Sequence, residues 1–184
     1  EAHSGSEENA VSEYLKKVDI NALNPVILQK FLSNGLQEET KNFVKDYFFA
    51  IGHEPMESIV FRNYVVLNVR FSVLSFLKGI GCETKELDSE NTEEALVESG
   101  KSLENAISYA ENMITQAIIL RDQNSGNKNR SILKTAVDFI ESHYMEEEIS
   151  LNTVANVANV SANHFSALFS QNMGQTFIEH LTTL

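Results

Sequence analysis

The stretch SLNTVANVANVSANHFSALF, residues 150–169, combines small and polar side chains with apolar ones at helical spacing. Ser150 and Ser161 are suited to cap two successive helices. In the second helix, Phe165 and Phe169 are spaced to face a core. Asn159 falls between the helices, and Asn is among the few residues other than Gly that tolerate a positive φ. The pattern predicts helix, tight turn, helix, which suits either a pair of packed helices or a DNA-reading element.

The composition of the whole chain favours helices. Of its 184 residues, 42% are hydrophobic and 22% charged, and only two are Pro and eight Gly. Apolar residues recur at helical spacing in long runs. We therefore expect an all-α fold.

Helix boundaries can be placed in the first part of the chain. Asn24 is a plausible N-cap with Pro25 at the first helical position, and Gly35 suits a left-handed residue after the helix. Turn and cap signals further along indicate a buried helix ending at Gly52 and a short helix within an acidic connection. The further helices are expected over residues 36–52, about 58–78, about 92–98 and 102–123.

The segment from Ile59 to Ile80 is the most apolar in the chain, but it carries two Arg, a Lys and Asn68. These polar groups are too many for a bilayer span, so a buried helix is predicted and no membrane partner. The single Cys82 excludes an internal disulfide, is interpreted as a buried neutral thiol, and fits a reducing, cytoplasmic setting.

The clearest boundary is NSGNKN, residues 124–129, because Asn, Ser and Gly favour turns. It separates two predicted modules. The first ten residues resemble a linker, and the segment VSEYLKKVDI is interpreted as the end of an upstream helix. The predicted organisation is 1–23 linker or helix end, 24–122 helical regulatory or dimerisation segment, 123–130 linker, and 131–184 helix-turn-helix module.

The last module resembles the first helix-turn-helix subdomain of the AraC/XylS transcription regulators. Asn159 stands where that pattern has Gly, Ala162 where Pro is frequent, and His180 at an aromatic position. The resemblance implies a homeodomain-like subdomain after the helical bundle-like segment. It rests on Ser150, Leu151, Ala155, Asn159, Ser161, Phe165, Phe169, Gly174, Phe177 and Leu181.

Residues 24–122 resemble, less specifically, the helical segment between receiver and DNA-binding module in YesN-type two-component response regulators. This resemblance implies a homodimer, an upstream receiver domain with a cognate histidine kinase, and a helical segment that relays the state of the receiver. Family members carry two helix-turn-helix units, so the second unit is expected beyond Leu184.

The second helix of the motif would then read double-stranded DNA. Asn163 can donate to and accept from adenine, Ser166 can meet any base edge, and Ala167 can touch a thymine methyl group. The alternative is that these are short solvated side chains on an amphipathic helix. Backbone contacts are expected from Ser161, His164, Ser170 and Gln171.

The net charge of −12 opposes this interpretation, because phosphate contacts need clustered Lys and Arg. From Lys128 to Leu184 there are three Lys or Arg against six Asp or Glu, a net charge of −3. The competing hypothesis is therefore a helical protein-protein or ligand-sensing module with little DNA binding of its own.

Catalysis, cofactors and metal binding are not expected. The sequence contains no Gly-rich phosphate loop and no GxSxG motif. His143, His164 and His180 lie too far apart, with no Cys at ligand spacing, to suggest a metal site. Eight aromatic residues could line a ligand pocket, but core packing is expected of aromatics at helical spacing. They are Phe43, Tyr47, Phe48, Phe49, Phe61, Tyr64, Phe71 and Phe76.

Overall fold

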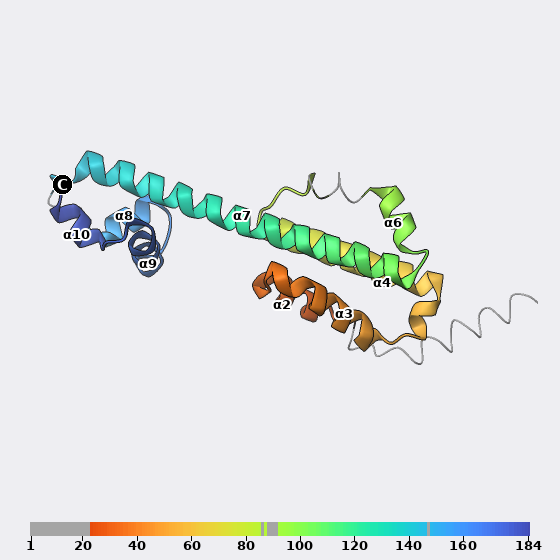
Figure 1. Ribbon diagram of the computed structural model, residues 1–184. Helices are drawn as coiled ribbons and strands as arrows, with labels where there is room; N and C mark the ends of the chain where they lie inside the picture. The colour runs from red at the N-terminus through yellow and green to blue at the C-terminus, as the bar shows by residue number, and fades with distance from the viewer. Residues whose placement is uncertain (1–22, 86, 88–91, 147) are drawn as a thin grey trace, which may run out of the picture. The chain divides into compact units, whose positions relative to one another are not determined.

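The computed structural model describes residues 23–85, 87, 92–146 and 148–184, and all regular elements over these residues are helices (Figure 1). The all-α prediction is confirmed. The chain forms two compact units, Glu1–Asp122 and Gln123–Leu184, each with its own hydrophobic core. The predicted end of an upstream helix, VSEYLKKVDI, lies outside the described residues.

Side-chain caps start the helices of the first unit. The Asn24 side chain accepts a hydrogen bond from the amide of Val26 at the start of α2. Ser58 caps α4 and Thr92 caps α6 in the same way. The elements are α2 (Pro25–Asn34), η2 (Gln37–Glu39), α3 (Thr40–Ile51), η3 (Pro55–Glu57), α4 (Ile59–Gly79), α6 (Glu93–Ser99) and α7 (Leu103–His143).

The core of the first unit is built around α4, which lies beside α7 (Figure 1). Val65, Val69 and Val73 of α4 are fully buried. Leu28 of α2 and Ile114 of α7 belong to the same cluster. Each such side chain contributes about 1.5–3 kcal/mol when fully buried, so one face of α4 supplies much of the stability of this unit.

Among the described helices, α4 is long and apolar enough to cross a membrane by length and composition. Our expectation that its polar residues rule this out was therefore too strict. Its buried Arg62 donates hydrogen bonds to the carbonyl oxygens of Met56 and Gly100, and four of its five valines are fully buried in the core. These contacts are those of a core helix.

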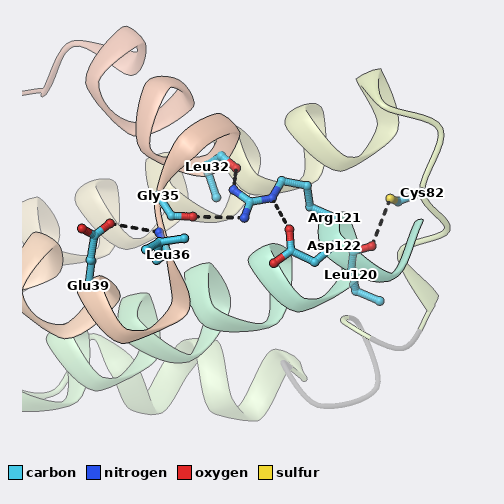
Figure 2. A network of polar contacts seen from close by, with 8 residues as sticks. All are labelled: Leu32, Gly35, Leu36, Glu39, Cys82, Leu120, Arg121 and Asp122. Carbon is cyan, nitrogen blue, oxygen red and sulfur yellow. Dashed lines mark hydrogen bonds and ion pairs between the residues drawn. The ribbon is translucent and has the colours of Figure 1, made fainter. Parts of the chain in front are cut away.

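Two expectations about individual residues are wrong. Gly35 has φ of −69°, so it is extended rather than left-handed. A Cβ at Gly35 would lie 2.7 Å from the backbone carbonyl oxygen of Phe31, which cannot move aside as a side chain can, so the position needs Gly. Cys82 is half-buried, and its thiol donates to the carbonyl of Leu120 at 3.7 Å (Figure 2).

The prediction that the eight aromatic residues pack in the core is only partly correct. Tyr47, Phe48 and Phe61 are buried, and Phe43 and Phe76 are half-buried against the same core. The other three, Phe49, Tyr64 and Phe71, are exposed.

Residues 123–130, predicted as a linker, are helical and lie within the 41-residue helix α7. The boundary between the two units still falls here, after Asp122. Ending one helix and starting another would leave unsatisfied backbone groups at both ends and require a new nucleation step. Continuing the helix through poor helix formers such as Gly126 costs about 1 kcal/mol per Gly, so the helix propagates.

The second unit contains the last part of α7, α8 (Leu151–Val157), α9 (Ala162–Met173) and α10 (Phe177–Thr182). Ala136 and Ile140 of α7 are fully buried in its core, together with Phe165 and Phe169 of α9 and Val154 of α8. Thus α7 supplies core residues to both units.

Candidate nucleic-acid interface

The first helix of the motif, α8, begins at its predicted cap. The Ser150 hydroxyl accepts a hydrogen bond from the amide of Thr153 at 3.1 Å. Val154 and Ala155 are buried, and the small side chain of Ala155 lies in the core beside α9. The inward face of α8 is therefore fixed, and its polar side chains are left outside.

The turn after α8 is a Schellman motif. Asn159 has φ of 58°, and among the described residues it is the one non-Gly residue with a positive φ. The amide of Val160 donates a hydrogen bond to the carbonyl of Ala155 at 3.0 Å, which is the 6→1 hydrogen bond that defines this motif. The predicted left-handed turn at Asn159 is confirmed, and it sets the direction in which α9 leaves.

The second helix, α9, is anchored by aromatic rings. Ser161 caps it by accepting from the amide of His164 at 3.3 Å. The rings of Phe165 and Phe169 lie 5.4 Å apart, and both contact the ring of Phe177 at 6.3 Å. Pairs of this kind contribute about 0.5–1.5 kcal/mol beyond burial, so the orientation of α9 is held from its inner side.

The predicted DNA-contacting residues lie together on the outer side of α9. Asn163 and Ala167 are exposed, and Ser166 is half-buried between them. They are spaced at i, i+3 and i+4, and so share one helix face. Of the four predicted backbone-contacting residues, three are exposed and Ser170 is half-buried; the exposed ones are Ser161, His164 and Gln171.

The outer face of α9 is electrically almost neutral. The helix contains no Asp, Glu, Lys or Arg, and its one titratable side chain is His164. Any attraction for phosphate from α9 itself must therefore come from amide and hydroxyl donors and from the positive end of the helix dipole near Ser161.

The start of α10 completes the module. Thr176 and Glu179 form a capping box, in which each side chain accepts a hydrogen bond from the backbone amide of the other residue. Hydrogen bonds from the Thr176 amide and hydroxyl lower the pKa of Glu179. Gly174 has φ of 68° and ends α9 in the left-handed conformation.

Two of the three histidines of the module, His143 and His180, are used in packing, and the third, His164, is exposed. The ring of His180 contacts the edge of Phe169 and hydrogen-bonds Gln175, so it takes the place of the aromatic residue in the family pattern. His143 stacks on Phe139 at 4.1 Å. Within the described ranges, no three His, Cys, Asp or Glu side chains come together as a metal site.

Sequence reasoning overlooked two side chains on α8. Asn152 and Asn156 are both exposed and one turn apart. In helix-turn-helix proteins the first helix crosses the DNA backbone, where amide groups can donate to phosphate. The signal in the sequence was the pair of Asn residues at i and i+4 on a helix whose other face is apolar.

A comparison with protein families supports the assignment of the second unit as a helix-turn-helix module. Residues 140–182 match the family described as bacterial regulatory helix-turn-helix proteins, AraC family. The matched range contains α8, α9 and α10. The same comparisons found no match among curated proteins or solved structures. The C-terminal unit thus carries an AraC-type helix-turn-helix, a DNA-binding domain of transcription regulators.

Proposed function

We propose that this protein is a sequence-specific transcription regulator of the response-regulator type, in which α9 enters the DNA major groove. Asn163, Ser166 and Ala167 read base edges, and Ser161, His164, Ser170 and Gln171 contact the backbone. The observation that carries the proposal is the exposed, uncharged face of α9, held from behind by Phe165 and Phe169. The inner side of the helix is packed in the core of the second unit, and its outer side chains remain available.

Weak phosphate attraction follows from the charge of this unit. With a net charge of −3 from residue 128 to the end, the module has few groups that can displace counterions. Specific affinity therefore has to come from several modules acting together, as in dimers that bind two half-sites. This supports a homodimer as the DNA-binding form.

The first unit relays a signal in this proposal. Helix α7 contributes Ile114 and Ile118 to the first core and Ala136 and Ile140 to the second. A change in how the first part of α7 packs is thereby transmitted along one continuous helix. The signal comes from a receiver domain phosphorylated by a cognate histidine kinase, and the regulator itself is cytoplasmic.

Selection from a pool of random DNA duplexes tests base reading. At low salt we expect the chain to enrich one sequence, and Asn163→Ala to relax the preference at one position by about 1–3 kcal/mol of discrimination, the contribution of a bidentate contact. Ser166→Ala should relax the preference at a separate position by less, because a single hydroxyl can meet more than one base edge. Asn42→Ala, at an exposed position of α3, is the matched control and leaves the preference unchanged.

Unchanged sequence preference in both α9 variants would refute the groove assignment. If the wild-type chain enriches no sequence at any salt concentration, the competing function applies. In that case residues 24–122 act as a helical interaction module, as the net charge of −12 favours.

A further inference from the structure

Helix α4 carries a second apolar face that the described residues of the first unit leave largely exposed. Val60, Tyr64 and Phe71 are 67%, 52% and 63% exposed, and Leu67 between them is half-buried. We call these four residues the α4 stripe. Large apolar side chains grouped on one face of a soluble protein mark an interaction surface.

The spacing of the α4 stripe is that of a coiled-coil seam. Its members follow one another at intervals of four, three and four residues, as the a and d positions of a heptad do. Val69, which falls opposite this seam, is fully buried in the core. The helix is therefore apolar on two opposite sides, one for its own unit and one for a partner helix.

An uncharged groove lies along three of the four stripe residues, Tyr64, Leu67 and Phe71. The groove has a volume of about 400 Å³, and its lining contains no Asp, Glu, Lys or Arg. The amide oxygen of Asn68, which lines the groove beside the stripe, is buried without a hydrogen-bond partner among the described residues. The groove is lined by Gln29, Tyr64, Leu67, Asn68, Phe71, Ser72 and Ser75.

The charge of the chain favours a second copy of the same chain as the partner at this groove. The chain has 26 acidic residues and a net charge of −12, so two copies repel each other wherever their carboxylates meet. A groove without carboxylates is a place where two such copies can approach without this cost. It offers nothing to nucleic acid, which needs clustered positive charge.

We propose that the α4 stripe pairs two copies of this chain across a two-fold axis, helix against helix. This rests on the proposed function, in which two protomers bind DNA together, and it names the surface that joins them. Each aromatic side chain offers about 150–250 Å² when fully exposed, so the stripe alone covers less than the roughly 800 Å² per partner of a stable complex. The dimer is accordingly weak and depends on concentration.

Sedimentation equilibrium of the 184-residue chain over a wide concentration range tests the pairing. We expect the mean mass of the wild type to rise toward that of a dimer, and Tyr64→Glu and Phe71→Glu to weaken association at least tenfold. Phe49→Glu is the matched control, because Phe49 is 87% exposed on α3 and lies outside the groove. Circular dichroism checks that each variant is folded.

Three results would overturn the proposal. The first is a wild-type chain that stays monomeric at every concentration. The second is association that neither Tyr64→Glu nor Phe71→Glu weakens, and the third is a control variant, Phe49→Glu, that weakens association as much as the two stripe variants do. A further arm mixes the chain with vesicles of phosphatidylcholine and phosphatidylglycerol. Binding of the monomer that Phe71→Glu abolishes would assign the stripe to a membrane instead.

DNA selection on the same samples separates this proposal from the proposed function. If the chain dimerises through the stripe but enriches no DNA sequence, the proposed function is refuted and the proposed pairing surface is supported. If the chain enriches a DNA sequence as a monomer, the proposed function is supported and the proposed pairing surface is refuted.

Discussion

The guanidinium of Arg121 in α7 donates a hydrogen bond to the carbonyl oxygen of Leu32 in α2, at 2.7 Å (Figure 2). It donates a second one to the carbonyl of Gly35 at 3.0 Å. Both carbonyls belong to the end of α2, where backbone acceptors have no partner inside the helix. Arg121 thus joins α7 to α2 immediately before the boundary between the two units.

Arg121→Ala should lower the free energy of unfolding by about 1.5–3 kcal/mol, because hydrogen bonds from a charged donor are lost and two carbonyls lose their partner. Chemical denaturation followed by circular dichroism measures this. Lys101→Ala, which removes an exposed ion pair with Glu98, is the control and should cost under about 1 kcal/mol. Equal losses for the two variants would contradict a role for Arg121 in stability.

Asn159→Val should destabilise the second unit by about 1–2 kcal/mol, since a β-branched residue is strained at a φ of 58°. The same change at Asn156, which is exposed within α8, should have little effect because Asn and Val have similar helix propensities. Asn159→Gly should match or slightly exceed the wild type. Thermal unfolding of the three variants decides the matter, and an unchanged melting temperature for Asn159→Val would be evidence against the strained turn.

Tyr47→Phe should reduce the sensitivity of the fold to alkali. Burial, with a smaller effect from the nearby Tyr64, raises the pKa of Tyr47 from 10.0 to about 12. Because the folded-state pKa is the higher one, this stability is fully present below pH about 10 and is lost as the pH rises toward 12. Melting temperatures between pH 8 and 12 should fall less steeply for the variant, and parallel curves would refute the expectation.

Gln171→Lys should strengthen DNA binding and steepen its dependence on salt. One new phosphate contact changes the slope of log K against log salt concentration by about 0.9. Fluorescence anisotropy with a labelled duplex measures the slope. Ser108→Lys adds the same charge at an exposed position of the first unit and should leave it nearly unchanged. An equal effect from both would indicate a general charge effect rather than contact at α9.

The helix-turn-helix could be predicted from sequence because its determinants are local. Ser150 and Ser161 cap helices through bonds to residues three positions away. Asn159 shapes the turn through its own backbone. Capping and positive φ depend on the identity of one residue and its close neighbours, so no knowledge of the rest of the chain was required.

The predicted linker failed because local preference was not decisive there. Asn124, Ser125 and Gly126 favour turns in isolation, yet they lie within α7. The strong helix-forming segments on both sides, anchored in different cores by residues such as Ile118 and Ile140, make continuation less costly than interruption. A window of six residues contains no information about that anchoring.

Exposure of the aromatic residues could not be predicted for a related reason. Phe48 is buried and Phe49 is exposed, although they are neighbours on the same helix. Helical spacing shows which residues share a face of a helix, but it does not show which face other helices cover. On α4, which is apolar on two faces, the packing partners alone decide that Phe61 is buried and that Tyr64 and Phe71 are exposed. The DNA-contacting roles of Asn163 and Ser166 stay predictions, since they concern a molecule outside the fold.

The buried Arg62 has a consequence for the way in which the first unit opens. Its guanidinium binds the carbonyls of Met56 and Glu57 on one side and those of Gly100 and Lys101, about forty residues later, on the other. If either segment detaches from Arg62, the charged guanidinium loses two of its hydrogen-bond acceptors, so the two segments are held in place together. In hydrogen exchange, the amides of η3 and those at the end of α6 should therefore behave as one cooperative unit with a shared opening free energy.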